Sequence, residues 1–173
     1  MTSLVNPKDS ISNTVQLTTF YVEKELYGIE VMRVQEVTGN PTIVKVPLAP
    51  AFVLGMINLR GQISTALGLR TLFGYGPETS TEKMSVVCRI DGGLVSLLVD
   101  SIGEVVEVSS RQFESPPETI PSFAKKLLKG IYKMDGVLLS VIDLEKLSQE
   151  LCRTNESEGT GDVVLKPESR RSA

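Results

Sequence analysis

The sequence contains an internal repeat, and this feature constrains the fold more than any other. One copy runs from Gly55 to Leu72 and the other from Gly130 to Leu147, and their glycines and closing leucines match at an offset of 75 residues. Upstream, residues 28–37 match residues 96–105 at an offset of 68. A repeat of this length indicates one supersecondary unit used twice. We therefore predict two related halves, the second carrying an insertion of seven residues (75 − 68).

Short segments rich in β-branched and aromatic residues alternate with turn-forming residues along both halves. This pattern predicts a mainly β protein made of small barrels. Each half, of about 60 residues, would be marginally stable alone, so the halves should share a core. The predicted strands are 15–22, 26–29, 43–46, 56–59, 63–67, 85–90, 94–99, 103–108, 131–134 and 137–141.

The remaining elements are predicted to be short helices and tight turns. Asp135-Gly136, between two apolar segments, predicts a type I′ hairpin turn. Ser122 and Asp143 are of the residue types that cap helix N-termini. The predicted helical segments are one or two turns at 47–54, a turn at 69–73, a helix at 122–128 capped by Ser122, and a helix from Asp143 to Leu151.

Composition divides the chain into a central domain and two polar ends. Residues 1–14 are predicted to be a flexible N-terminal segment, and residues 15–151 to be one domain made of two pseudo-repeated barrels. Residues 152–173 contain few apolar side chains, which predicts a disordered polar tail.

Composition also argues against several function classes. The net charge of −3 and the absence of a basic, aromatic-rich patch argue against nucleic-acid binding. No apolar run is long enough to span a bilayer, so we expect a cytoplasmic protein without direct membrane contact. The chain has no histidine and only two cysteines, which argues against histidine-dependent catalysis and cysteine metal sites. Asp100, Glu104 and Glu107 could act as acid and base, but nothing pairs them with a nucleophile, so we predict no enzymatic activity and no cofactor.

Two motifs have both a structural and a functional interpretation. In Asn58-Leu59-Arg60-Gly61, Gly61 suits a positive-φ turn position and Arg60 would point into solvent. Alternatively, Arg60 presents a planar donor to a carboxylate of a partner. In residues 27–37, two half-buried strands around a bend would leave some apolar side chains outside, forming a patch suited to a partner helix.

Three stretches resemble the CheW family of chemotaxis coupling proteins: residues 27–37, residues 55–61, and residues 95–100 with Glu104-Val105. The resemblance extends over about residues 16–151. It implies two packed, five-stranded SH3-like barrels, with short helices and a C-terminal helix. It also implies a non-catalytic scaffold without a cofactor. Such a scaffold joins the cytoplasmic tip of methyl-accepting chemotaxis receptors to the regulatory domain of the chemotaxis histidine kinase.

The resemblance also implies two sets of binding residues. Receptor binding in the family is attributed to the groove between the barrels and to the Asn-Leu-Arg-Gly region. The implied receptor-binding residues are Val34, Glu36, Gly55, Asn58 and Arg60. The implied kinase-binding residues, in the loop from Glu114 to Ile120, are Glu114, Pro117 and Ile120.

The chain departs from the family pattern where the first copy ends. Thr65 and Gly68 stand where the family usually has proline and aspartate, whereas the second copy keeps Asp143. The loss of that aspartate removes an expected helix cap. The alternatives are a diverged paralogue serving a non-flagellar chemosensory pathway and a nucleic-acid-binding small barrel. A carboxylate enzyme is the weakest alternative.

Overall fold

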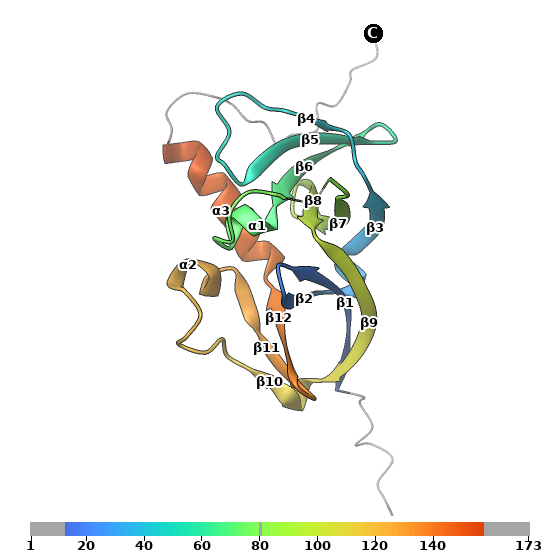
Figure 1. Ribbon diagram of the computed structural model, residues 1–173, viewed down its shortest axis with the longest axis vertical. Coiled ribbons are helices and arrows are strands. Elements are labelled where there is room, and N and C mark those ends of the chain that lie inside the picture. The colour runs from blue at the N-terminus through green and yellow to red at the C-terminus, as the bar shows by residue number, and fades with distance from the viewer. Residues whose placement is uncertain (1–12, 80, 158–173) are drawn as a thin grey trace, which may run out of the picture.

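The computed structural model describes residues 13–79 and 81–157, which form two packed β domains (Figure 1). Sheet A has the strand order β10-β11-β12-β2-β1-β9, and sheet B has the order β3-β7-β8-β6-β5-β4. The elements are β1 (Thr14–Val22), β2 (Glu25–Glu30), the 3₁₀ helix η1 (Val31–Arg33), β3 (Val34–Gly39), β4 (Ile43–Val44), β5 (Val53–Leu59), β6 (Gln62–Gly68), α1 (Leu69–Leu72), β7 (Met84–Ile90), β8 (Gly93–Val99), β9 (Ser101–Ser109), the 3₁₀ helix η2 (Ser110–Gln112), β10 (Phe113–Glu114), α2 (Ser122–Lys125), β11 (Leu128–Met134), β12 (Val137–Ile142) and α3 (Leu144–Ser157).

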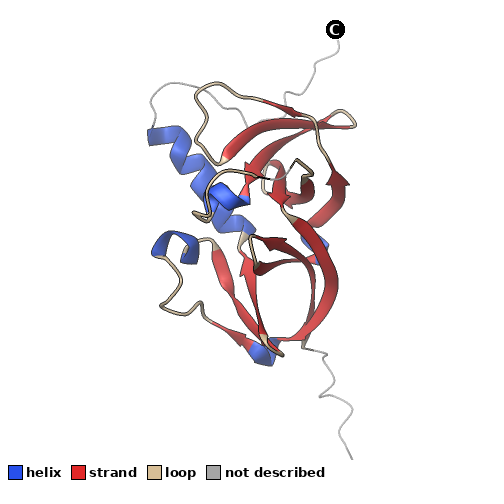
Figure 2. Ribbon diagram, in the orientation of Figure 1, coloured by secondary structure: helices blue, strands red, loops and turns tan. Residues whose placement is uncertain are grey.

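The mainly β fold predicted from the repeat is confirmed, and strands dominate both domains (Figure 2). Each sheet contains six strands, of which one, β4 or β10, has only two residues. When sheet B is read from β4 to β3, its strand order matches that of sheet A position by position. The equivalent strands are β10 and β4, β11 and β5, β12 and β6, β2 and β8, β1 and β7, and β9 and β3. The same supersecondary plan is therefore used twice, as the repeat indicates.

The two sequence repeats exchange their first hairpins. Strands β1 and β2 belong to the first repeat but complete sheet A, whose other strands come from the second repeat. Strands β7 and β8 belong to the second repeat but complete sheet B. The repeats meet at two parallel strand pairs, β12 with β2 and β6 with β8. Each domain is therefore built from strands of both repeats.

The main core contains buried side chains of both sheets, together with three leucines of α3. We call the domain that contains sheet A domain A and the one that contains sheet B domain B, and Figure 1 shows α3 running from domain A alongside domain B. Leu144, Leu147 and Leu151 follow the spacing of one helix face and pack in this core. A second, smaller core in sheet A includes Leu17 and Leu139. The shared main core explains why the two domains pack together.

Several local predictions are corrected by the structure. No helix forms at 47–54: residues 47–52 form turns and loop, and β5 begins at Val53, because prolines stand at 47 and 50 and Leu48 has a φ of +59°. The strand predicted at 43–46 is only Ile43–Val44. Helix α2 ends at Lys125, since β11 begins at Leu128, and its N-cap is Pro121 instead of Ser122.

The Asp135-Gly136 turn is also corrected. Met134 pairs with Val137, which leaves two residues in the turn as predicted. Gly136 has a φ of +74°, but Asp135 is not among the positive-φ residues. A type I′ turn needs positive φ at both central positions, so this prediction is wrong.

The chain ends are described only in part. Helix α3 continues to Ser157, beyond the predicted end at Leu151 and into the stretch predicted as a tail. The Asp143 cap is present, since its Oδ1 accepts a hydrogen bond from the Lys146 N–H at 3.1 Å. The rest of the predicted N-terminal segment (1–12) and tail (158–173) lies outside the described residues.

Candidate functional site

The tip of the β5–β6 hairpin presents Arg60 to solvent. Leu59 pairs with Gln62, so Arg60 and Gly61 form a two-residue turn, with φ of +52° and +90°. Positive φ at both positions is the pattern of a type I′ turn, which favours Asn, Asp and Gly. Asn58 Oδ1 accepts the Gly61 N–H at 2.8 Å and steadies the turn. The Arg60 side chain is 90% exposed, so the turn projects its guanidinium outwards from an unfavourable backbone conformation.

Side chains of strand β3 contact side chains of the β5–β6 hairpin. Glu36, whose side chain is 24% exposed, lies with Oε2 3.6 Å from Arg60 Nη2. Next to it, Gln35 donates to Gln62 Oε1 at 3.3 Å and accepts from Arg89 Nη2 at 2.8 Å. We call the surface formed by Gln35, Glu36, Asn58, Arg60 and Gln62 the hairpin surface. Strand β3 is an edge strand of sheet B and is not a hydrogen-bonded neighbour of β5 or β6, so these side chains connect strands that are separated in the sheet order.

Exposed apolar side chains lie on the same elements. Met32, in η1 next to β3, is 91% exposed, and Val37 in β3 is 41% exposed. Ile63 is 57% exposed and pairs with Asn58, so both side chains are on one face of the β5–β6 hairpin. The prediction that residues 27–37 form two strands around a bend, with some apolar side chains outside, is confirmed.

Val34 and Gly55 lie beneath the hairpin surface and contribute to packing. Val34 is half-buried and packs against the main core. Gly55 is buried with a φ of +145°, and a Cβ there would lie 2.2 Å from the backbone oxygen of Val44. Gly55 therefore permits β4 to approach β5 closely. Of the five predicted receptor-binding residues, Glu36, Asn58 and Arg60 share the hairpin surface, whereas the other two shape its support.

The predicted kinase-binding residues lie on domain A. Glu114, in β10, is exposed and forms an ion pair with Lys133 at 2.9 Å. Pro117 and Ile120 are half-buried, and the Ile120 N–H donates to the Pro117 oxygen at 3.2 Å. Ile120 also packs against the main core, so it anchors the loop. Figure 1 shows β10 and the β5–β6 hairpin at opposite ends of the molecule.

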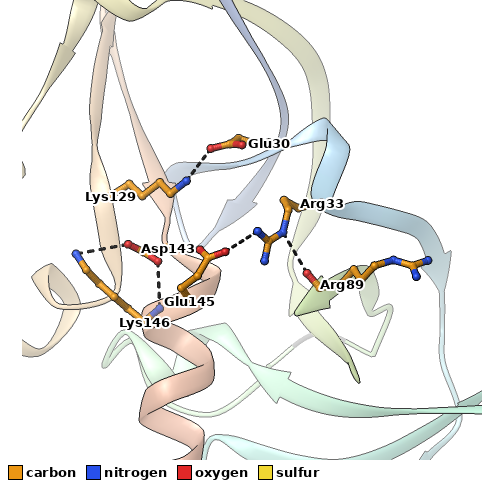
Figure 3. Close-up of polar contacts among 7 residues, drawn as sticks. All are labelled: Glu30, Arg33, Arg89, Lys129, Asp143, Glu145 and Lys146. Carbon is orange, nitrogen blue, oxygen red and sulfur yellow. Dashed lines mark hydrogen bonds and ion pairs between the residues drawn. The ribbon is translucent and has the colours of Figure 1, made fainter. Parts of the chain in front are cut away.

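A polar network connects the domains beside α3 (Figure 3). Arg33 Nη1 bonds Glu145 Oε1 at 2.5 Å, and Arg33 Nε donates to the Arg89 backbone oxygen at 3.2 Å. Lys129 Nζ bonds Glu30 at 2.7 Å, and this hydrogen bond raises the pKa of Lys129. A cleft of about 580 Å³ borders the network, lined by Arg33, Asp91, Glu145, Ser148, Gln149, Cys152 and Arg153. The sequence interpretation missed these contacts, which join residues far apart in the chain.

A second charged cluster surrounds Arg70 of α1. The nearly buried Arg70 side chain bonds Asp100 Oδ2 at 2.8 Å and Glu23 Oε2 at 2.6 Å. Asp100 Oδ2 also accepts the Glu23 backbone N–H at 2.6 Å. Burial lowers the pKa of Arg70, but the bonds to Asp100 and Glu23 outweigh this effect and raise it. The charge of Asp100 is thus paired with Arg70, and this structural contact explains its position without a catalytic role.

Glu78 lies beside Gly68 at the start of α1. Gly68 precedes α1 and offers no side-chain cap, as predicted from the sequence. A Cβ at Gly68 would lie 2.9 Å from Glu78 Oε1, so this carboxylate sits at the start of α1. Burial raises the pKa of Glu78, and a hydrogen bond to the Arg70 backbone opposes that rise. Glu78 therefore supplies, from the loop after α1, the acceptor that Asp143 provides for α3.

Three further observations concern Cys88, potential metal ligands and the length of the helices. Cys88 is fully buried, and burial raises the pKa of its thiol to about 12, as expected of a core residue. Across residues 13–79 and 81–157, no cluster of three or more potential metal ligands is found. In the same residues, every helix is too short or too polar to cross a membrane.

Comparisons with known proteins agree with this architecture. The family model for the CheW-like domain matches residues 16–152. Chemotaxis protein CheW of Treponema pallidum (strain Nichols) is 32% identical over 143 residues, which cover 79% of this chain and 84% of that protein. Chemotaxis protein CheW of Klebsiella aerogenes is 29% identical over 129 residues, covering 74% of this chain and 78% of that protein.

A solved structure gives the same result. The crystal structure of the scaffolding protein TtCheW from Thermoanaerobacter tengcongensis aligns with a TM-score of 0.70 and 32% identity. The alignment covers 77% of this chain and 91% of that chain. Fold, repeat and sequence therefore agree, and the chain belongs to the CheW family of chemotaxis scaffold proteins.

Proposed function

We propose that this protein is a non-catalytic adaptor that couples methyl-accepting chemotaxis receptors to the chemotaxis histidine kinase. The observation that carries the proposal is Arg60. It is exposed at a turn position that disfavours arginine, and Glu36 from a distant strand lies beside it. Strained residues concentrate at functional sites, and family membership supplies the functional context.

The hairpin surface offers chemistry suited to the cytoplasmic tip of a receptor. On the same elements as the hairpin surface, Met32, Val37 and Ile63 expose apolar area that one face of a partner helix would cover. Arg60 could exchange its long 3.6 Å contact with Glu36 for a carboxylate of the receptor. A charge-assisted hydrogen bond of this kind contributes about 1.5–3 kcal/mol once the partner excludes water. Because receptor tips lie in the cytoplasm, the proposal places this protein there, without direct membrane contact.

The regulatory domain of the kinase would bind at the other end, around Glu114, Pro117 and Ile120. The exposed Glu114 can exchange its ion pair with Lys133 for a basic residue of the kinase. The half-buried Pro117 and Ile120 fix the loop that presents Glu114. Since the two surfaces lie on different domains, both partners can bind at once, and signalling would change their relative placement.

Binding to a receptor cytoplasmic fragment tests the receptor side of the proposal. We expect Arg60→Asp to weaken binding about tenfold or more, since it removes a contact of about 1.5–3 kcal/mol and adds repulsion. Arg111→Asp is the matched control, because Arg111 is also exposed but lies in η2 of domain A. Equal binding by both variants, with folding confirmed by circular dichroism, would remove Arg60 from the receptor surface.

A further inference from the structure

Two short connections carry the chain from one domain to the other. The first crossover, Val31–Arg33, joins β2 of sheet A to β3 of sheet B. The second crossover, at Asp100, joins β8 of sheet B to β9 of sheet A. These connections are where the exchange of hairpins between the repeats takes place.

Each crossover is held by an ion pair to the helix that closes the other repeat. Arg33 of the first crossover pairs with Glu145 of α3 at 2.5 Å (Figure 3). Asp100 of the second crossover pairs with Arg70 of α1 at 2.8 Å. Neither pair is fully exposed, since the side chains of Arg33 and Glu145 are 33% and 43% exposed and that of Arg70 is 11% exposed. Both pairs therefore keep part of their electrostatic strength.

The two pairs use equivalent positions with opposite charge. Arg70 and Glu145 are each the second residue of their helix and match at the repeat offset of 75 (70 + 75 = 145). Arg33 and Asp100 occupy the two crossovers, one residue apart in the alignment at an offset of 68 (32 + 68 = 100). In the Arg33–Glu145 pair the cation is on the crossover and the anion is on the helix. In the Asp100–Arg70 pair the anion is on the crossover and the cation is on the helix.

We propose that this reversed polarity specifies the hairpin exchange by directing each crossover to the helix of the other repeat. If each helix packed against the crossover of its own repeat, Arg33 would face Arg70 and Asp100 would face Glu145. Both contacts would then be between like charges. A contact between like charges is more costly for Arg70 because its side chain is buried. Its charge is stabilised by carboxylates of the protein instead of by water. The repeats have similar apolar patterns, so charge distinguishes arrangements that hydrophobic burial distinguishes poorly.

The proposal can be separated from simple stabilisation by exchanging one pair. In Arg33→Glu/Glu145→Arg the ion pair is kept, but the four charges no longer discriminate between the two arrangements. The carboxylate introduced at position 33 could then also attract Arg70, and the guanidinium introduced at position 145 could also attract Asp100. In the control Arg33→Gln/Glu145→Gln the pair is lost, yet no attraction within a repeat is created. If the ion pair only stabilises the fold, the Gln control should be less stable and the charge-exchanged variant should fold normally. If the polarity of the pair selects the arrangement, the charge-exchanged variant should form non-native species.

The measurement is refolding of the full chain from denaturant, followed by two-dimensional NMR and size-exclusion chromatography. Amide contacts between Tyr27 and Ser140 report the native β2–β12 pairing, and contacts between Thr65 and Val95 report β6–β8. We expect the control to refold to one native species of slightly lower stability. We expect the charge-exchanged variant to show at least about a fivefold rise in species lacking these contacts, the factor that corresponds to ~1 kcal/mol.

The proposal is overturned if the charge-exchanged variant refolds to a single species with both native contacts. It is also overturned if that variant fails to fold while the Gln control folds, because the pair would then depend on local geometry and not on polarity. Equal amounts of non-native species in both variants would likewise assign the effect to lost stability.

Discussion

Arg60 combines an exposed charge with a backbone conformation that usually favours other residues. A φ of +52° costs a non-glycine residue about 1 kcal/mol, and Gly61 beside it already supplies the second positive φ of the turn. Asp135, at the matched position of the second copy, does not adopt positive φ. The first copy therefore carries a strain that the fold does not require of both hairpins.

Replacing Arg60 by glycine should separate stability from binding. Arg60→Gly removes the positive-φ strain, so we expect the free energy of unfolding to rise by up to about 1 kcal/mol. The same change removes the guanidinium and should weaken receptor binding. Urea unfolding and titration with a receptor fragment measure the two effects. A destabilised variant would show that Arg60 is held in the turn by favourable contacts within the chain.

Gly55 should behave in the opposite way. Gly55→Ala places a Cβ against the Val44 oxygen at a φ that alanine rarely adopts, so we expect destabilisation of about 2–4 kcal/mol. Thermal unfolding measures this loss. Gly61→Ala is the control, because a Cβ at Gly61 meets nothing within 4 Å although its φ is also positive. Similar losses at both positions would assign the effect to φ alone and not to the approach of β4.

At the scale of elements, the two closing helices start in different ways. Helix α3 is capped by Asp143 within its own sequence, whereas α1 uses Glu78 from the following loop. This arrangement explains how α1 starts after Gly68, where the resemblance to the family implies an aspartate. Glu78 is half-buried, and its buried Oε1 has no hydrogen-bond partner among the described residues.

Restoring the family aspartate should be harmful unless Glu78 is removed. Gly68→Asp would bring two carboxylates together in a buried site, and we expect a loss of about 1–3 kcal/mol. In Gly68→Asp/Glu78→Ala the new aspartate can cap α1, so most of that loss should be recovered. A double-mutant cycle by urea unfolding measures the coupling. Additive effects would show that Glu78 does not replace the aspartate.

The half-buried Glu78 carboxylate should also make stability depend on pH. The pKa of Glu78 is raised in the folded state, so the folded protein binds this proton more readily than the unfolded chain does. The contribution of Glu78 to the free energy of unfolding is therefore most favourable at low pH. This contribution is lost as pH rises from the pKa of the unfolded state through the raised pKa of the folded state. Glu78→Gln removes this titration. In urea unfolding, the stability of the variant relative to the unmodified protein should increase as pH rises above the unfolded pKa of glutamate, about 4.3, and a flat difference would contradict the assignment.

At the scale of the whole molecule, the sequence supported the repeat but could not reveal how the repeats combine. Strand segments and the Asp143 cap depend on local patterns, and these were predicted well. The exchange of hairpins was not predicted, because similar repeats give the same pattern whether or not they exchange strands. The Arg33–Glu145 pair spans 112 positions of sequence, and Arg70 pairs with Asp100 across the domains. The offset of 75 that aligns Arg70 with Glu145 was the available signal.

The candidate site was predicted in part for the same reason. Asn58 and Arg60 lie within one turn motif, so their proximity follows from the sequence. Glu36 reaches Arg60 from β3, a strand that does not neighbour the β5–β6 hairpin in the sheet. Gln35 contacts Gln62 and Arg89, and no local sequence pattern reveals these contacts. Burial of Gly55 and Val34 likewise depends on the packing of β4 and the main core.

The central claim is that the molecule binds two partners through opposite ends. The most direct test measures binding of Arg60→Asp and Glu114→Arg to both a receptor cytoplasmic fragment and the regulatory domain of the kinase, by isothermal titration. We predict that Arg60→Asp loses affinity for the receptor and keeps that for the kinase, while Glu114→Arg does the reverse. If each folded variant retained both affinities, or lost both together, two separate binding surfaces at these positions would be contradicted.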